Sequence, residues 1–285
     1  MKQIVVASGK GGTGKTSIVA SFASLTKAVF TDCDVDAPNL HLILKPEIIE
    51  KIPYEGMEVA EINEEECIKC GACQKACRFG AIENFMVTEE KCEGCGVCML
   101  VCPVNAIEMK KRVNGYVHVA NTRFGEFVYG LLIPGEEASG KLVALVRQKA
   151  KEIAERKDKN LIIIDAPAGI GCPVIASLSG TDLAVIIAEP TMAAIHDMER
   201  ILEVAEHFKV KAVVCINKYD INEEMTKKIE EYCRERGIEI IGKIPFNRKF
   251  TEAMVKGKNI VEYDKELADL MKEIWKKVED MISQK

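Results

Sequence analysis

Near the N-terminus, residues 9–16 form a glycine-rich loop with the sequence Gly9-Lys10-Gly11-Gly12-Thr13-Gly14-Lys15-Thr16. The loop follows an apolar segment over residues 3–7, a predicted strand, and opens a helical pattern over 15–26. Glycines here let backbone N–H groups turn towards phosphates, Lys15 meets the β- and γ-phosphates, and the Thr16 hydroxyl binds Mg²⁺. The residues expected to hold the nucleotide phosphates are Gly11, Gly12, Thr13, Gly14, Lys15, Thr16 and Ser17.

Apolar segments and helical patterns alternate along most of the chain. Further strands are predicted over residues 28–32, 161–165, 183–188, 211–216 and 238–242. Further helices are predicted over 141–157, 194–208, 222–236 and 264–283. Such alternation favours βαβ units, and continuous apolar strands are typical of a sheet covered by helices on both faces. We therefore expect an α/β fold with a doubly wound, mostly parallel sheet.

The interval 63–112 breaks this alternation and contains an internal repeat. Adding 25 to the positions of the first four cysteines gives those of the second four: Cys67, Cys70, Cys73, Cys77 and Cys92, Cys95, Cys98, Cys102. Ala81-Ile82 recurs as Ala106-Ile107 in the same way. We expect a first part of the main domain over 1–62, an inserted domain over 63–112 and the second part over 113–285.

The spacing Cys-x2-Cys-x2-Cys-x3-Cys, present twice, is that of bacterial ferredoxins, in which the fourth cysteine of each run binds the other cluster. One expected 4Fe-4S cluster is held by Cys67, Cys70, Cys73 and Cys102, and the other by Cys92, Cys95, Cys98 and Cys77. Structural zinc is the alternative, but all-cysteine zinc sites usually have two CxxC pairs separated by a longer loop. The insert is therefore expected to be an α+β, ferredoxin-like domain with two 4Fe-4S clusters.

The glycine-rich loop contains an extra lysine, Lys10, which points to a known family of phosphate-binding loops. The form GKGGTGKT resembles the deviant Walker A motif of P-loop ATPases in the MinD, Mrp and nitrogenase iron protein superfamily. In that superfamily this lysine reaches across a homodimer to the partner's nucleotide, so the resemblance implies an ATP-dependent homodimer with Lys10 as a catalytic group. A solvated loop lysine is the alternative.

Acidic residues follow two of the predicted strands. Carboxylates at the C-terminal ends of strands beside a phosphate loop lie where Mg²⁺ needs oxygen ligands. Residues 31–39 resemble the superfamily's switch I, which implies that Asp34 orients the attacking water and that Asp32 supports the Mg²⁺ shell. Residues 161–169 resemble a Walker B strand and switch II, which implies that Asp165 touches Mg²⁺ through water and that Gly169 offers an N–H to the γ-phosphate.

The base is expected to bind beyond two later strands. By the same resemblance Asn217 and the backbone at Pro245 hold adenine, which favours ATP and its product ADP. The segment Asn217-Lys218-Tyr219-Asp220 also matches the guanine-reading pattern NKxD. GTP therefore stays open.

Composition and charge limit the kinds of partner and the cellular location that we expect for the protein. The 39 basic and 44 acidic residues give a net charge of −5, and no basic stripe is present, which argues against nucleic acid. The chain starts directly in a strand without a signal peptide and has no run of about 18 apolar residues, which favours a cytoplasmic protein. The C-terminal amphipathic pattern lacks a basic, aromatic-anchored face, so we expect it to pack on the domain rather than on a membrane.

Four cysteines lie outside the repeat. Cys215 and Cys233 are expected to be small core residues, and Cys33 has no evident partner. Cys172 lies seven residues after Asp165, where the nitrogenase iron protein has one ligand of its intersubunit cluster. The second ligand is missing, so we expect no bridging cluster. A pair of Cys172 residues that faces a partner or substrate protein stays open as an alternative.

The resemblance covers the whole chain and leads to three hypotheses for this expected ATPase. The first is an ATP-gated redox protein that transfers electrons to a partner protein. The second is an assembly factor that delivers iron–sulfur or related metal units to a metalloprotein. The third, a cargo-positioning ATPase, does not need clusters.

Overall fold

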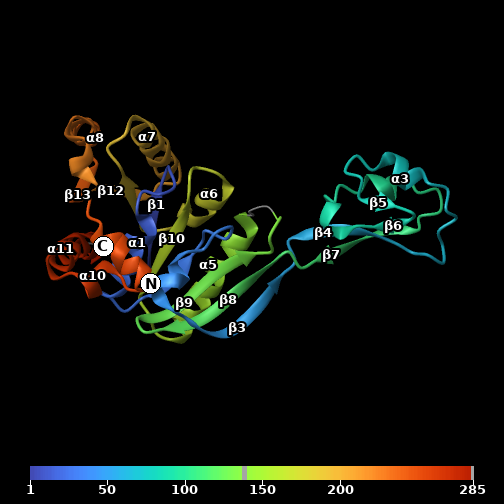
Figure 1. Cartoon of the computed structure of the whole chain (residues 1–285), viewed down its shortest axis with the longest axis horizontal. Helices are drawn as coiled ribbons and strands as arrows, with labels where there is room; N and C mark the ends of the chain where they lie inside the picture. The colour runs from blue at the N-terminus through green and yellow to red at the C-terminus, as the bar shows by residue number, and fades with distance from the viewer. Residues whose placement is uncertain (137–139, 284–285) are drawn as a thin grey trace. The chain divides into compact units, whose positions relative to one another are not determined.

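The computed structural model describes residues 1–136 and 140–283 (Figure 1). The chain divides into two compact units. The first comprises residues 1–52 and 117–131 with the C-terminal part of the chain, and the second comprises residues 53–116 and 132–136. Each unit is considered by itself below.

Strands and helices make up most of the described residues. The strands are β1 Lys2–Ser8, β2 Val29–Asp32, β3 Glu47–Tyr54, β4 Met57–Ile62, β5 Ile82–Glu83, β6 Met86–Val87, β7 Ile107–Arg112, β8 Gly115–Thr122, β9 Gly125–Leu132, β10 Leu161–Ala168, β11 Leu183–Ala188, β12 Lys211–Asn217 and β13 Glu239–Ile244. The α-helices are α1 Lys15–Ala23, α2 Leu40–Leu44, α3 Ala72–Ala76, α4 Val97–Leu100, α5 Gly140–Arg156, α6 Cys172–Leu178, α7 Met192–His207, α8 Glu223–Glu235, α9 Lys249–Val255, α10 Ile260–Tyr263 and α11 Lys265–Ser283.

The first unit is built on a nine-stranded sheet with the order β13-β12-β11-β1-β10-β2-β9-β8-β3. The pairings from β13 through to β9 are parallel, which confirms the expected mostly parallel α/β fold. Residues 123–124 alone connect β8 to β9, so these two strands form an antiparallel hairpin. The six strands expected from the sequence are the six consecutive strands from β13 to β2, and β9, β8 and β3 extend this sheet.

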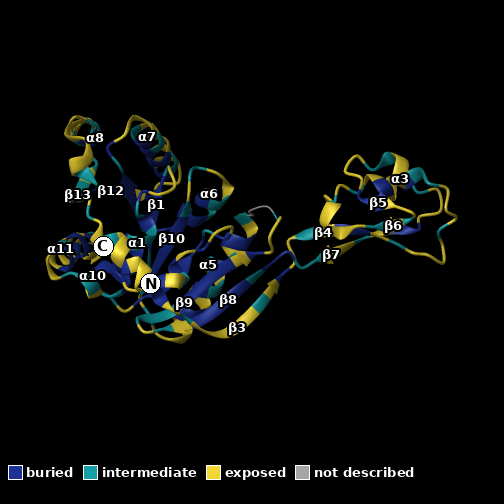
Figure 2. Ribbon diagram, viewed as in Figure 1, coloured by how far each residue is buried: buried dark blue, intermediate teal, exposed yellow. Residues whose placement is uncertain are grey.

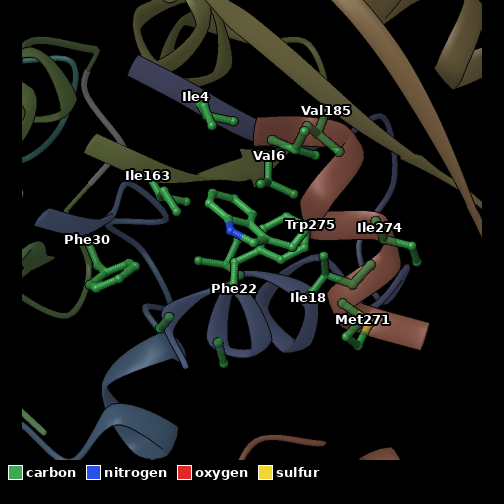
Figure 3. Close-up of a cluster of buried hydrophobic side chains, with 14 of the residues drawn as sticks. Ile4, Val6, Ile18, Phe22, Phe30, Ile163, Val185, Met271, Ile274 and Trp275 are labelled. Carbon is green, nitrogen blue, oxygen red and sulfur yellow. The ribbon is translucent and has the colours of Figure 1, made fainter. Parts of the chain in front are cut away.

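The core of the first unit lies between the sheet and its helices, where the central strands are buried (Figure 2). Phe22 of α1 packs against Trp275 of α11 with ring centroids 4.9 Å apart, and Ile4 and Ile163 of the sheet lie in the same cluster (Figure 3). The apolar stripe of α11 is buried in this cluster, so the C-terminal helix packs on the domain as expected. In the described residues, no helix is long and apolar enough to cross a membrane.

The second unit has two small antiparallel pairs, β4 with β7 and β5 with β6, and the short helices α3 and α4. Its buried cluster consists of Ala60, Cys73, Ile82, Cys98 and Ile107. Further cysteines lie partly buried around this cluster. The expected insert, 63–112, lies inside this unit, which also takes in β4 and the chain up to residue 116.

Candidate functional site

A cavity of about 610 Å³ opens beside the glycine-rich loop, a size typical of small-molecule sites. Its lining includes Gly12, Thr13, Gly14, Lys15, Thr16, Ser17, Asn217 and Pro245. Gly12 and Gly14 have φ of 81° and 86°, which a side chain would disfavour, and this backbone carries the loop from β1 into α1. Gly11 and Gly169, also expected to touch the nucleotide, are not among the lining residues.

Lys15 lines this cavity and reaches Asp165, which lies within β10. Its Nζ is 3.5 Å from Oδ1 of Asp165, and both side chains are almost fully buried. That same Oδ1 is buried and has no hydrogen-bond partner. A buried carboxylate oxygen without a hydrogen bond fits the neighbourhood of a cation or its water shell.

The strand register sets Asp32 directly opposite Asp165, because β2 and β10 pair in parallel at this level. Burial and the Asp165 charge together raise the pKa of Asp32 well above the usual aspartate value. The two Asp32 oxygens accept the N–H groups of Asp34, Asn39 and Leu40, each at 3.0 Å. Asp32 therefore holds the loop that leads into α2.

Asp34 is half-buried, and burial raises the pKa of its carboxyl whereas nearby Lys15 lowers it. Burial likewise raises the pKa of Asp165, against the lowering effect of Lys15. Both carboxylates thus stand near the lysine that is expected to meet the phosphates. The structure brings Asp32, Asp34, Asp165 and Lys15 to one edge of the sheet.

Two other predicted residues have simpler surroundings. Lys10 is exposed, and its carbonyl accepts a hydrogen bond of 2.8 Å from the Ser8 hydroxyl. Gly169, with φ of 97°, donates its N–H to the Ser8 carbonyl at 3.0 Å. That N–H would have to leave Ser8 in order to reach a phosphate.

On the base side, Asn217 joins β12 to the glycine-rich loop. Its Nδ2 donates to the Thr13 carbonyl at 2.7 Å, and its Oδ1 accepts the N–H of Lys218 at 3.0 Å. Lys218 Nζ donates to the Gly12 carbonyl at 3.1 Å. Asp220 Oδ1 accepts the N–H of Phe246 at 2.6 Å. These side chains fasten together the loops around the cavity.

Several lining residues were not anticipated from the sequence. They are apolar and come from α2, from α9 and from the loop after β13: Leu42, Ile43, Phe246, Phe250, Met254 and Val255. Phe246 and Met254 are half-exposed, at 54% and 44%. The sequence shows only apolar residues in the two short segments that form α2 and α9, whereas their exposure and their place beside the cavity are seen in the structure.

Two small cavities lie in the second unit, and each is lined by four cysteines. The first cavity is lined by Cys67, Cys70, Cys73 and Cys102. The second is lined by Cys77, Cys92, Cys95 and Cys98. Each cavity thus gathers three cysteines of one run and the last cysteine of the other. In the residues that the structure describes, no three His, Cys, Asp or Glu side chains are grouped as a single metal ion would need.

The remaining cysteines divide into buried and exposed groups. Burial raises the pKa of Cys33 and of Cys215 to about 12, and that of Cys233 to about 11, so their thiols stay protonated. Cys172 is exposed at the start of α6.

The first unit can be compared with known proteins on the basis of this phosphate loop and sheet. The model of the CobQ/CobB/MinD/ParA nucleotide binding domain matches residues 4–260. The chain belongs to this family. As a MinD/ParA-type P-loop protein it is a nucleotide-binding ATPase, as expected from the loop.

Relatives extend over nearly the whole chain. Uncharacterized protein MJ0578 of Methanocaldococcus jannaschii is 34% identical and is covered over 97% of its length by 98% of this chain. The septum site-determining protein MinD of Bacillus subtilis is 25% identical, with 94% of this chain and 84% of that protein covered. These relatives establish the ATPase family. They do not establish iron–sulfur binding.

Solved structures agree on the fold. MinD of Pyrococcus horikoshii, complexed with Mg-ADP, has a TM-score of 0.61 at 17% identity, over 97% of this chain and 95% of that chain. MinD in the MinC:MinD complex of Aquifex aeolicus has a TM-score of 0.58 at 20% identity, over 98% and 96%. At these identities the likeness shows the MinD-type fold alone.

Proposed function

We propose that this MinD/ParA-type ATPase carries two 4Fe-4S clusters and couples ATP binding and hydrolysis in a homodimer to electron transfer to a partner protein. The observation that carries the proposal is the sorting of eight cysteines into two separate cavities. In each cavity the fourth cysteine comes from the other run, which is the arrangement that bacterial ferredoxins use. The two bound clusters would supply one-electron chemistry.

The chemistry of the donor set fits a cluster. Each thiolate of a 4Fe-4S cubane binds a different iron, so four sulfurs surround the cube and need not converge on one point. The absence of a single-ion grouping in the described residues is therefore compatible with this cofactor. Backbone N–H groups already point at cysteine sulfurs, for example from Ala106 to Cys102 at 3.2 Å.

The packing of the second unit also supports a bound group. Its buried cluster is small, and two of its members, Cys73 and Cys98, are cysteines. In a domain of about 70 residues the hydrophobic core rarely supplies more than about 3–5 kcal/mol, and a structural metal is one common addition. We propose that this second unit is the inserted domain and that its eight paired-run cysteines are the cluster ligands.

On the nucleotide side, we assign the phosphates to the loop from Gly11 to Ser17 and Mg²⁺ to Thr16 with the carboxylates of Asp34 and Asp165. Oδ1 of Asp165 is paired with the Lys15 charge at 3.5 Å but accepts no hydrogen bond, and this is the observation that fits a hydrated cation there. Asp32 contributes by holding the switch loop through its three N–H partners. Mg²⁺ would neutralise charge on the phosphates.

For the base we propose adenine. The carboxylate that a guanine-reading pattern would use belongs to Asp220, and it already accepts the N–H of Phe246. Asn217 keeps one amide hydrogen for the ligand while it holds Thr13, and the Pro245 backbone lines the same cavity. Lys10, exposed on the loop, would complete the site of a second copy in the ATP-bound dimer.

Coupling between the sites can be measured because it must be reciprocal. If nucleotide changes the reduction potential, then reduction changes ATP affinity by the same factor, and we expect about fivefold or more. Anaerobic calorimetry of ATP binding to oxidised and reduced protein provides this measurement. A matched variant, Lys15→Ala, should remove the binding signal in both redox states.

Two outcomes would change the proposal. Anaerobically purified protein should contain about eight irons per chain, as two cubanes require. Zinc in their place would reject the clusters. Eight irons with equal ATP affinities in both redox states would reject ATP-gated electron transfer and favour the assembly factor, with the second unit as a docking or electron-supply module.

A further inference from the structure

The two cysteine cavities are related by the 25-residue repeat, and so are most hydrogen bonds to their sulfurs. Ala81 donates its N–H to Cys77 Sγ at 3.3 Å, and Ala106 donates to Cys102 Sγ at 3.2 Å. These two bonds occupy equivalent positions in the two copies. Each cavity therefore receives one such bond from the repeat.

One further bond breaks this symmetry. The N–H of Ala60 in β4 donates to Cys92 Sγ at 3.5 Å. Ala60 lies outside both copies of the repeat, and the hydrogen bonds recorded for the described residues include no counterpart to the equivalent sulfur, that of Cys67. Alternate residues of an antiparallel strand direct their N–H away from the neighbouring strand, so this donor is free for the sulfur.

Charged side chains also differ between the cavities, but in opposing ways. Glu93 lines the second cavity where the repeat places Ile68 in the first. Arg78 follows Cys77, whereas Pro103 follows Cys102. Glu93 and Arg78 are both exposed, have opposite charges and are screened by solvent. The partly buried N–H of Ala60 donates to a sulfur of the second cavity, and it is therefore the difference that decides which of the two sites has the higher reduction potential.

We infer that the cluster site of Cys77, Cys92, Cys95 and Cys98 has the higher reduction potential of the two. The inference rests on the proposed function. A reduced cluster carries one more negative charge, part of it on the sulfurs, and an N–H aimed at a ligand sulfur stabilises that charge. An added electron therefore resides at the second site, and the site of Cys67, Cys70, Cys73 and Cys102 is the stronger reductant.

The experiment is an EPR-monitored redox titration of the full chain carrying both clusters. Two serine variants at equivalent, exposed ligand positions, Cys70→Ser and Cys95→Ser, assign each signal to its site. We expect the reduction equilibria of the two sites to differ by about tenfold, which corresponds to 59 mV for one electron.

Two backbone variants test the cause. Ala60→Pro removes the extra N–H and should lower the reduction equilibrium constant of the second site by about the same tenfold factor. The reduction equilibrium constant of the first site should change by less than about twofold. Ala106→Pro is the matched control, because it removes the donor to Cys102 and should lower the reduction potential of the first site instead. Iron content and the EPR spin count of each variant show whether both clusters are present.

The outcomes separate this inference from the proposed function. Fewer than about eight irons in wild-type protein would reject the clusters themselves. Eight irons with equal potentials, or with the first site higher, would overturn the inference alone, as would an Ala60→Pro variant that shifts neither site. If Ala60→Pro does not assemble both clusters, the order of the two reduction potentials assigned in wild-type protein still tests the inference.

Discussion

The nucleotide unit and the cysteine unit differ in what organises their sites. In the first unit, side chains and backbone already fix the site: Asp32 holds the loop that leads into α2, Asn217 holds Thr13, and the Phe22–Trp275 cluster supports helix α1. In the second unit the proposed ligands are themselves part of the small core. The first site is thus formed by a folded scaffold, whereas the proposed cluster sites would help to form theirs.

Iron removal should produce the largest difference between the units. Because metal binding energy contributes directly to the folding of small metal domains, anaerobic chelation should raise amide hydrogen exchange in β4, β7, α3 and α4 by about a hundredfold or more. The strands of the first unit, measured in the same sample, are the internal control and should keep their protection. Unchanged exchange in the second unit would mean that its own core is sufficient.

The lysine that is proposed to act across the dimer comes next. Lys10→Ala should lower ATP hydrolysis by about 10³-fold and abolish ATP-induced dimerisation, because a charge supplied in trans stabilises the transition state. ATP binding should persist through Lys15. Steady-state turnover and analytical ultracentrifugation measure both effects, with the exposed Lys272→Ala as a control. Normal turnover in Lys10→Ala would assign that residue to a solvated loop.

A core substitution tests whether the units are independent in stability. Phe22→Ala should lower the free energy of unfolding of the first unit by about 3–5 kcal/mol, because it leaves a cavity beside Trp275. Trp275 is the single tryptophan, so its fluorescence during urea unfolding reports on this unit. Phe208, 37% exposed, provides the control Phe208→Ala, which should cost much less. Loss of iron in Phe22→Ala would show that the units depend on one another.

The smallest expected effect is a dependence of magnesium binding on pH. Burial raises the pKa of Asp165 and of Asp34, and burial with the Asp165 charge raises that of Asp32. Protonated carboxyls do not bind Mg²⁺, so Mg-ADP affinity should fall as pH decreases through these raised values, by up to about tenfold per unit.

The same shifts have a consequence for stability. A carboxyl whose pKa is higher in the folded state makes the free energy of unfolding decrease as pH rises through that pKa. Mg²⁺ binds only the ionised carboxyls, so Mg-ADP should stabilise the first unit more at neutral than at acidic pH. The stabilisation by ADP with EDTA should depend much less on pH. Thermal unfolding at several pH values checks both. Equal stabilisation at all pH values would contradict the placement of the cation beside these carboxylates.

Local signals in the sequence determined much of the first unit. Glycine spacing defined the phosphate loop, and continuous apolar runs marked the six consecutive strands from β13 to β2. Strands β3, β8 and β9 were missed. The edge strand β3 is mostly exposed and lacks an apolar run, and polar residues or glycines interrupt the apolar runs of the buried strands β8 and β9. The apolar lining from α2 and α9 was missed as well, since short helices carry too little periodicity to place.

Which distant residues meet was decided by the tertiary structure. The sequence placed Asp32 and Asp165 at the ends of strands, but only the tertiary structure buried Asp32 and, through the register of β2 against β10, set it opposite Asp165. Burial first, and the Asp165 charge second, raise the pKa of Asp32. Likewise the spacing of the cysteines suggested two sets of four, whereas the N–H that Ala60 donates to Cys92 could not be read from either repeat. Spacing reports contacts within a turn or two of backbone, but pairings between remote segments depend on strand register and packing, which the whole chain fixes together.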